Sequence, residues 1–397
     1  MTHLWIANCL AAFGLGVLCA GIIIPQILLI SFRKSLFDEP DARKIHTSKV
    51  PRLGGLAFMP VVCFAFVLLF GLNMKFAGAA FIASATPYLQ PLAFAACALM
   101  ILYIVGMADD LVGVRYNAKF AAQVMSAVLA ICGGVWFETF GGFFGVGAVP
   151  PLVGWAMTIV ATVFIINAIN LIDGIDGLAS GLCSICLLCY GLVYALAGEW
   201  IFSILAFATV GVLVPFFYYN VFGDPRRHKK IFMGDTGALT VGMMIAFLGI
   251  HLLQIEAPAQ LGRMNMLVVA FSPLIVPCFD VVRVYGERIS VRSNPFLPDK
   301  RHIHHKLLAL GLTQRAAMIS LLAASFVFSA ANTVASNWID INALLVIDAA
   351  IWAVAIVLVN KRIAKRRPLT PAAGEGCRRM GEPRSTTPAE TRIDMLR

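Results

Sequence analysis

Charged residues are scarce in this sequence. Asp, Glu, Lys and Arg together make up 13% of its 397 residues, about half of the share that is usual in a soluble domain. Apolar residues make up 60% of the chain, and the mean hydropathy is +0.85. This composition excludes a single water-soluble globule, because there is too little polar surface to cover it. We therefore expect most of the chain to lie in lipid.

Three other features are absent. The N-terminal stretch lacks a basic start and a small-residue cleavage site, so we expect its apolar run to be a retained span and not a cleaved signal peptide. No polar loop is longer than about 30 residues, which is too short for a separate soluble core. No internal repeat is visible, which disfavours a transporter built from inverted halves.

Apolar runs that are long enough to cross a bilayer as helices follow one another along the chain. The sequence predicts an all-α, polytopic integral membrane protein with about eleven transmembrane helices. The predicted spans are 5–30, 55–72, 88–106, 120–137, 150–170, 177–197, 200–221, 237–256, 265–282, 316–335 and 341–360. Residues 1–365 form the membrane domain, and residues 366–397 are expected to be a basic, disordered tail.

Lys and Arg are concentrated in alternate loops. If the N-terminus lies outside, the segments on the cytoplasmic side hold 29 of the 31 Lys and Arg residues, and only Lys75 and Arg263 lie outside. Cytoplasmic loops carry such an excess of cations, so we expect the C-terminus to be cytoplasmic.

Five polar motifs fall on the loops that are predicted to be cytoplasmic. In chain order they are RKIH with PRLGG, GMADD, NLIDGIDGLASG, FMGDTG and PFLPDKRHIHHKL. Carboxylates at the ends of membrane helices are costly unless they are paired or bind a metal. Five of them on one face, Asp109, Asp110, Asp173, Asp176 and Asp235, beside basic loops favour Mg²⁺ and phosphate groups as ligands.

Each motif alone also has a simpler explanation. Asp-Gly pairs form turns, and Asp often caps helices. The HIHH segment could be a solvated basic patch or a transition-metal site, although neighbouring cations disfavour a metal. Cys183, Cys186 and Cys189 are spaced like metal ligands, but we interpret them as the wall of an apolar helix.

Two further aspartates lie inside predicted spans. Asp280 stands three residues before Arg283, and we interpret the two as an ion pair that fixes a helix. Asp348 lies within the last span and has no assignment.

The five motifs, in this order, resemble those of the polyprenyl-phosphate N-acetylhexosamine-1-phosphate transferases. The resemblance runs from about Asp38 to about Arg315, and its last motif is similar to that of the undecaprenyl-phosphate GlcNAc-1-phosphate transferase branch. The related phospho-MurNAc-pentapeptide translocases share the core but differ in the last loop. Ala238 departs from the pattern, because many members have Ser there, and the stretch from Asn220 to Phe232 is longer than in the pentapeptide branch.

The resemblance implies a reaction and its ligands. A sugar-1-phosphate, with GlcNAc-1-phosphate favoured, would pass from a UDP-sugar to undecaprenyl phosphate with release of UMP. Mg²⁺, or Mn²⁺, would be required, and the site would face the cytoplasm at the bacterial inner membrane among membrane lipids. We expect no nucleic-acid partner, and a homodimer is an open prediction.

The resemblance also implies roles for individual residues. Asp235 would bind the metal, and Asp109 and Asp110 would act near the acceptor phosphate. The donor would be bound by Asp173, Gly174, Ile175, Asp176, Asn220, Phe232, Arg301, His302, His304 and His305. Secondary site residues would be Lys44, His46, Asn167, Asn170 and Asp299.

Several alternatives remain open from the sequence. The donor sugar could be GalNAc, QuiNAc or FucNAc, since small changes in a pocket alter such selectivity. A CDP-alcohol phosphotransferase is a rival enzyme, but DGIDGLASG lacks the Arg of that pattern. A transporter would place its key polar groups near the bilayer midplane, and a structural membrane protein would need no polar motifs on one face.

Overall fold

The computed structural model describes residues 2–36, 50–257, 262–290 and 301–366. Within these ranges the chain is helical apart from its connections and one isolated bridge between Thr139 and Ala148. Ten of the described helices are long and apolar enough to cross a membrane. The prediction of an all-α, polytopic membrane protein is therefore confirmed.

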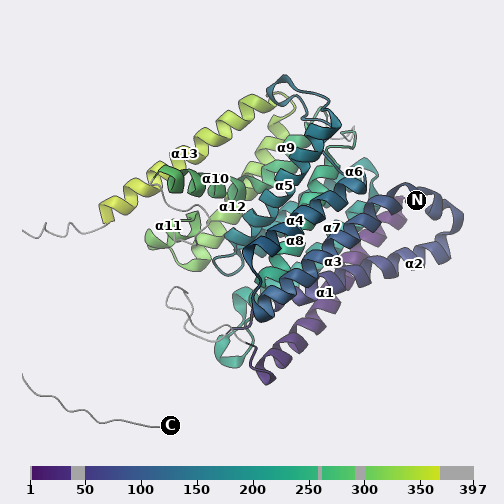
Figure 1. Ribbon diagram of the computed structural model, residues 1–397, viewed down its shortest axis with the longest axis horizontal. Helices are drawn as coiled ribbons and strands as arrows, with labels where there is room; N and C mark the ends of the chain where they lie inside the picture. Colours follow the sequence, from purple (N-terminus) through teal and green to yellow (C-terminus); the bar gives the residue numbers. More distant parts are fainter. Residues whose placement is uncertain (1, 37–49, 258–261, 291–300, 367–397) are drawn as a thin grey trace, which may run out of the picture.

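The helices lie roughly side by side and form one bundle (Figure 1). Their bounds are α1 (Thr2–Arg33), α2 (Phe58–Ala85), α3 (Leu89–Val112), α4 (Tyr116–Cys132), α5 (Pro151–Ile172), α6 (Leu178–Ala197), α7 (Trp200–Phe222), α8 (Gly234–Leu252), α9 (Met266–Phe271), α10 (Ile275–Ser290), α11 (Ile303–Ala309), α12 (Gln314–Ala335) and α13 (Ile341–Arg366). Short 3-10 turns include η1 (Gly54–Ala57), η4 (Pro225–Arg227) and η6 (Ser272–Leu274).

Three predicted spans differ most clearly from the helices observed. The second was expected to end at residue 72, but α2 continues to Ala85. The fourth was expected to reach residue 137, but α4 ends at Cys132 because Gly133 and Gly134, the latter with φ +87°, turn the chain. Its 17 residues extend for about 25 Å, slightly less than the hydrocarbon core of a bilayer. The ninth span is interrupted at η6, where Pro273 cannot donate a backbone hydrogen bond, and it continues to Ser290.

Helix α8 lies at the centre of the bundle. All of its residues from Thr236 to Leu252 are buried, and it packs against α3, α5 and α6. At its first turn, a Cβ built on Gly55 of η1 would stand 2.0 Å from the backbone nitrogen of Gly237. Only glycine allows backbones to approach this closely, so PRLGG and FMGDTG pack directly together. By contrast, α1 and α13 are largely exposed along their apolar length, as expected for helices that face lipid.

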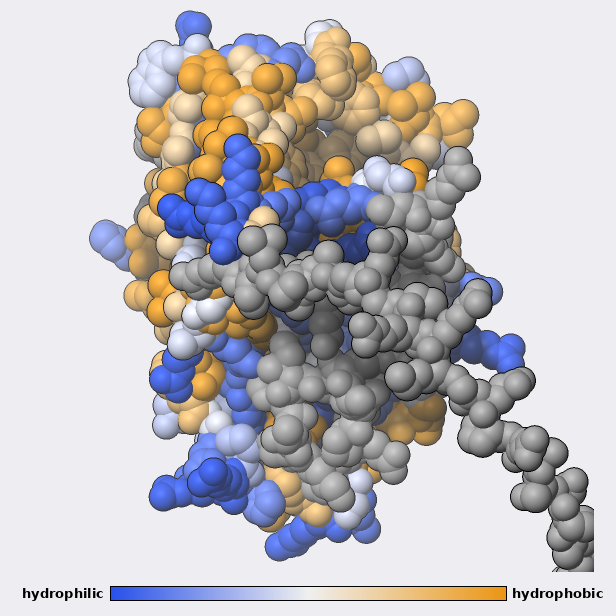
Figure 2. All heavy atoms as spheres, turned by 90° about the vertical axis from the view of Figure 1, so that its left-hand side faces the viewer, coloured by the Kyte–Doolittle hydropathy of each residue, from blue (hydrophilic) through white to orange (hydrophobic). Residues whose placement is uncertain are grey.

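The polar motifs meet at one end of the bundle. Helix α3 ends at Val112 where α8 begins at Gly234, and these two antiparallel neighbours bring GMADD beside FMGDTG. Figure 2 shows hydrophilic residues gathered on the face that is seen from the left of Figure 1, while the flanks of the molecule are mostly hydrophobic. The bundle thus presents one polar end, and the candidate site lies there.

Candidate active site

Asp110 binds the N-terminus of α8. Its Oδ1 accepts a hydrogen bond from the backbone N–H of Asp235 at 2.8 Å, and its Oδ2 accepts from the backbone N–H and the hydroxyl of Thr236 at 2.9 and 2.5 Å. The first N–H groups of a helix have no partner within the helix, and they favour a negative charge. The last turn of α3 therefore holds the first turn of α8 through this one carboxylate.

Lys119 of α4 joins two other carboxylates. Its Nζ lies 3.0 Å from Oδ2 of Asp109 and 2.7 Å from Oδ2 of Asp235. The backbone N–H of Val114 donates to the other oxygen of Asp109 at 2.7 Å. The lysine ammonium offsets the repulsion between two carboxylates that converge from α3 and α8.

The pair Asp109 and Asp235 fits a hard divalent cation. A cationic group already lies between their oxygens, and Mg²⁺ is usually held by one or two carboxylates together with substrate phosphates and water. In the described part of the chain, no three His, Cys, Asp or Glu side chains are placed to hold a metal. Few protein side chains would therefore bind the ion, and a substrate phosphate would complete its coordination.

The turn between α5 and α6 brings DGIDG to the same end. Gly177 caps α6 with φ +76°, a left-handed conformation that favours glycine, and Ile175 is buried beneath the turn. Asp176 accepts a hydrogen bond at 2.5 Å from Lys230, which is itself buried. The turn is thereby tied to the segment that leads into FMGDTG.

Asp173 lies beside the other acidic groups. Its side chain keeps contact with solvent, but dense protein around it removes hydration from the charged form and raises the pKa of the carboxyl to about 7. The charges of Asp176, Asp235 and Asp110 raise this pKa as well, and Arg52 opposes them. The four carboxylates are thus close enough to influence one another.

Asn220 links two of the motifs. Its Oδ1 accepts a hydrogen bond from the backbone N–H of Gly177 at 2.6 Å, and its Nδ2 donates to the carbonyl of Ile231 at 2.8 Å. The side chain is buried and both of its ends are occupied. In this structure Asn220 positions the DGIDG turn and does not offer a free polar group to a ligand.

Phe232 is half-buried next to the PRLGG segment. Its backbone N–H donates to the carbonyl of Pro51 and its carbonyl accepts from Gly54, both at 2.9 Å. These backbone bonds hold Phe232 beside PRLGG, two residues before Gly234 in the chain.

The HIHH segment is anchored by Asp280 of α10, which is fully buried. One oxygen accepts from Nη2 of Arg283 at 2.6 Å and from the backbone N–H of Ile303 at 2.9 Å, and the other lies 2.8 Å from Nδ1 of His302. The predicted ion pair between Asp280 and Arg283 is confirmed, and it also fixes His302. Lys306 extends this network to Glu287 and to Asn360 of α13.

His304 is buried against the DGIDG turn. Neither ring nitrogen has a hydrogen-bond partner, and a Cβ on Gly174 would stand 2.1 Å from its Nε2. Desolvation, together with the neighbouring His305 and His302, lowers the pKa of the imidazole to about 3. The ring is therefore neutral at pH 7, so it can act here as a hydrogen-bonding group but not as a fixed positive charge.

The remaining predicted residues are less central. Asn167 donates to Gln123 of α4 at 2.7 Å, and Asn170 is half-buried in the last turn of α5. Arg301 and His305 are half-buried beside the HIHH segment. Lys44, His46 and Asp299 lie outside the described residues, as does nearly all of the predicted tail.

The structure also places the three cysteines of α6 and Asp348, for which the sequence left other interpretations open. Cys183 and Cys186 are buried in the packing of α6, and Cys189 contacts Ser329 at 3.3 Å. Asp348 of α13 accepts a hydrogen bond at 2.6 Å from Asn332 of α12, which gives this buried carboxylate a partner.

Comparison with known proteins adds to this geometry. Glycosyl transferase family 4 matches residues 92–253, the segment that carries all five clustered aspartates. A Bacillus subtilis protein described as a probable undecaprenyl-phosphate N-acetylglucosaminyl 1-phosphate transferase is 31% identical over 365 residues, which cover 88% of this chain and 93% of the relative. The chain therefore belongs to glycosyl transferase family 4. The resemblance inferred from the motifs is thereby confirmed.

Other relatives of this glycosyl transferase family 4 protein carry similar names. Undecaprenyl-phosphate alpha-N-acetylglucosaminyl 1-phosphate transferases from Yersinia pestis and Escherichia coli (strain K12) are 28% and 27% identical to it. The alignments cover 75% and 77% of the chain, and 76% and 78% of the relatives.

Sequence reasoning missed two important residues of this family 4 site. Lys119 counted only as one cation of a loop, and no motif surrounds it. From the sequence, Lys230 is one cation of a basic loop, whereas in the structure it is the partner of Asp176. Each cation pairs with a carboxylate that is distant in the sequence, so only the packing of the helices reveals its role.

Proposed function

We propose that this protein transfers a sugar-1-phosphate, with GlcNAc-1-phosphate as the first choice, from a UDP-sugar to undecaprenyl phosphate and releases UMP. The observation that carries the proposal is the convergence of Asp109 and Asp235 on Lys119 at the polar end of a membrane bundle. The names of the relatives from three organisms support the same reaction.

Asp235 and Asp109 would hold Mg²⁺, with Mn²⁺ as the alternative. The bound ion would neutralise charge on two phosphate-bearing substrates that otherwise repel each other. Lys119 contributes positive charge at the same point, and Asp173 and Asp176 lie on the adjacent wall. The metal requirement is tested by the same assay as the reaction.

The chemistry is a phosphoryl transfer. An oxygen of the acceptor phosphate attacks the β-phosphorus of the donor, the bond from this phosphorus to the bridging oxygen breaks, and UMP leaves with that oxygen. The protein mainly positions and neutralises the reacting groups. Asp110 is fully engaged with the N-terminus of α8, so we assign it a positioning role. Asp109 is assigned to the metal together with Asp235, and a phosphate monoester, with a second pKa near ~6, carries little residual proton at neutral pH that a base would have to remove.

We place this site at the cytoplasmic face of the bacterial inner membrane. The contact of Lys306 with Asn360 puts the C-terminal end of α13 on the same face as the site. The two ends of α1 have different neighbours. Near its C-terminal end, the ring of Phe32 lies 4.0 Å from that of His228, close to η4. Near its N-terminal end, Trp5 stacks on Trp200 at a ring distance of 6.3 Å. The N-terminus therefore lies on the opposite face, and the excess of Lys and Arg on the site's face supports a cytoplasmic location. The homodimer stays a prediction.

The test is UMP release by purified protein. Reactions contain Mg²⁺ and undecaprenyl phosphate, and the donor is UDP-GlcNAc, UDP-GalNAc, UDP-QuiNAc or UDP-FucNAc in turn. We expect UMP formation that requires both lipid and metal and is fastest with UDP-GlcNAc. Folded protein that releases no UMP from any donor would refute the proposal and return attention to the CDP-alcohol alternative.

A further inference from the structure

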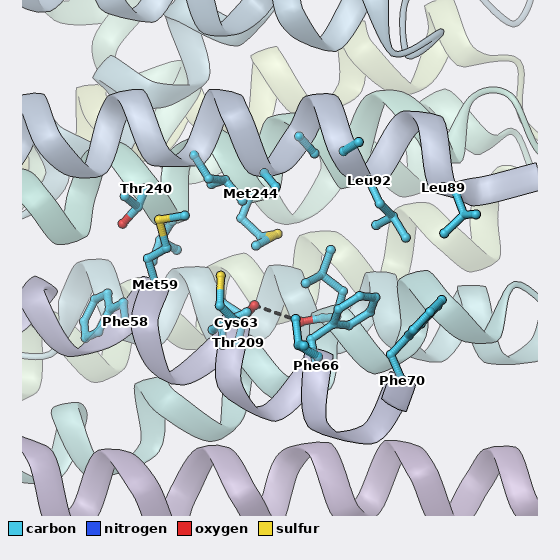
Figure 3. Close-up of a pocket in the computed structure, with 18 residues that line it drawn as sticks. Phe58, Met59, Cys63, Phe66, Phe70, Leu89, Leu92, Thr209, Thr240 and Met244 are labelled. Carbon is cyan, nitrogen blue, oxygen red and sulfur yellow. Dashed lines mark hydrogen bonds between the residues drawn. The ribbon is translucent and has the colours of Figure 1, made fainter. Parts of the chain in front are cut away.

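Lipid can meet the described part of the protein at surfaces of two kinds. Figure 3 shows one of them, an apolar cavity of about 330 Å³ between the diverging helices α2 and α3. Its lining residues are apolar apart from Thr209 and Thr240, whose hydroxyls donate to carbonyls of their own helices. Because no charged side chain lines this cavity, it does not distinguish lipid headgroups by their charge. Selection of lipids by charge requires a surface of the second kind, and the end of α13 has the residues for it.

Helix α13 faces lipid along most of its length. Its residues from Ile341 to Val359 extend for about 28 Å, which matches the hydrocarbon core of a bilayer. Figure 1 shows α13 at the edge of the bundle, with its C-terminal end projecting beyond α11. The turns that follow Val359 therefore reach the headgroup layer of the membrane.

These last turns of α13 carry cations and no anion. Lys361, Arg362 and Lys365 are exposed, and spacings of three and four residues place them on one face of the helix. None of the three forms an ion pair with a residue that the structure describes. Asp348, the only carboxylate of this helix, lies about 20 Å away along the axis and is bonded to Asn332. The headgroup layer therefore meets three cations that no described carboxylate neutralises.

The same end of α13 contacts the HIHH segment of the candidate site. Nζ of Lys306 in α11 donates to Oδ1 of Asn360 at 3.1 Å and to Oε1 of Glu287 at 3.0 Å. Helix α11 also carries His304, whose ring lies against Gly174 of the DGIDG turn. The position of the end of α13 is thus linked to the position of the histidines.

Few polar contacts hold α13 to the rest of the bundle. Near its start, Asn342 accepts a hydrogen bond from the backbone N–H of Phe144 at 2.8 Å, and further along Asp348 accepts one from Asn332. The third contact is the one with α11 described above, and most of the remaining surface is exposed and apolar. A lipid bound at the cytoplasmic end would therefore add substantially to the forces that position this end.

We propose that the basic end of α13, which consists of Lys361, Arg362 and Lys365, binds the headgroups of anionic phospholipids. The bound lipid stabilises the position of α11 through the contact between Asn360 and Lys306. The binding itself depends on charge and depth alone, because anionic headgroups lie where these cations leave the hydrocarbon. The effect on α11 rests on the proposed function, since it takes the HIHH segment to bind the donor.

Native mass spectrometry tests the binding without any need for turnover. Full-length protein in detergent is mixed with equal amounts of phosphatidylglycerol and phosphatidylcholine, and the lipid adducts are quantified. The α13 variant and a matched control, which removes three exposed cations in and beside η4, lose the same charge from the same face. The α13 variant combines Lys361→Gln, Arg362→Gln and Lys365→Gln, and the control combines Arg226→Gln, Arg227→Gln and Lys229→Gln.

We expect the preference for phosphatidylglycerol to fall about twenty-fivefold in the α13 variant and to persist in the control. A headgroup that lies between two cations gains about fivefold in affinity from each of them. An equal fall in both variants would show a general effect of net charge and overturn the site. Wild-type protein that binds both lipids equally would overturn it as well.

UMP release in vesicles tests the effect on the donor site. The vesicles contain phosphatidylcholine alone or with an equal amount of phosphatidylglycerol. We expect phosphatidylglycerol to lower the KM for UDP-GlcNAc about fivefold in the wild type relative to the α13 variant, as the contribution of one hydrogen bond would. Asn360→Ala should keep the lipid adducts but lose this difference in KM, because it removes the bond to Lys306.

The two readouts separate this inference from the proposed function. Specific phosphatidylglycerol adducts at α13 in protein that releases no UMP would uphold the lipid site and refute the transferase reaction. UMP release with the same KM response in the wild type and the α13 variant would uphold the reaction and overturn the effect of the lipid on α11.

Discussion

Asp109 and Asp110 are neighbours in the chain, but their side chains have different partners. Asp110 accepts three hydrogen bonds from the first turn of α8, while Asp109 shares Lys119 with Asp235. Two carboxylates of the same type thus divide between positioning a helix and binding charge. This division rests on which groups surround each of them, and the residue type alone does not reveal it.

Asp235→Asn keeps the shape of the side chain but removes its negative charge. We expect kcat for UMP release to fall at least about a hundredfold, because a preorganised charge at the reacting phosphates is lost. Asp340→Asn is the matched control, since Asp340 is exposed in the connection before α13 and its partner is Asn342. Normal turnover of purified Asp235→Asn would contradict the metal-binding assignment.

Because the pKa of Asp173 is raised, we expect the stability of the metal-free protein to depend on pH. The pKa of this carboxyl is raised to about 7, from an ordinary value near ~3.9. The folded state thus holds the proton more tightly than the unfolded state, so wild-type stability falls as the pH rises between these two values. Asp173→Asn cannot ionise and should escape this loss.

The measurement is thermal unfolding of both proteins in detergent with a chelator. We expect the Tm of Asp173→Asn to exceed that of wild type by a margin that grows from about pH 4 to about pH 7 and is then constant. A margin that does not change with pH would show that the carboxyl titrates at its ordinary value.

At the scale of elements, the first turn of α8 organises the site. It receives Asp110 from α3, contacts η1 through Gly55 and Gly237, and presents Asp235 to Lys119 of α4. Three other segments, α3, η1 and α4, therefore contact this one turn. The sequence located this turn correctly at the start of a span, but it gave no sign of which segments surround it.

Gly55→Ala tests the close contact between η1 and α8. The added methyl would overlap the backbone of Gly237, so we expect a loss of about 1–3 kcal/mol in unfolding free energy and a lower kcat. Gly71→Ala in α2 is the control, because a Cβ there meets nothing within 4 Å. Chemical denaturation measures the unfolding free energy of both variants, and UMP release measures their kcat. Equal unfolding free energies and equal kcat values in Gly55→Ala and Gly71→Ala would refute the close packing.

Helix lengths show where hydropathy alone falls short. The apolar run that predicted a span to residue 137 passes through Gly133 and Gly134, where α4 stops. Apolar residues beyond this point pack against neighbouring segments, as Phe137 does with Phe271 at a ring distance of 6.3 Å. The hydropathy of a residue measures how strongly it avoids water, but it does not show whether the residue contacts lipid or the protein interior.

At the scale of the whole molecule, the distribution of cations predicts the orientation in the membrane. We expect green fluorescent protein fused after Arg397 to fluoresce, because the excess of Lys and Arg predicts a cytoplasmic C-terminus. Alkaline phosphatase inserted after Ala257, in the connection between α8 and α9, should be active, because the same orientation predicts that this connection faces the periplasm. An active phosphatase at the C-terminus would reverse the orientation and place the site outside.

The sequence by itself determined the class of fold, the succession of spans and the five motifs, because these depend on local composition and on spacing along the chain. It also placed the motifs on one face, since the number of spans between them sets on which side each loop emerges. Only the tertiary structure decided that Lys119 lies between Asp109 and Asp235, that Asp280 holds His302, and that α2 and α3 diverge around a cavity. These contacts join segments far apart in the chain, and their geometry follows from how whole helices pack rather than from any local pattern.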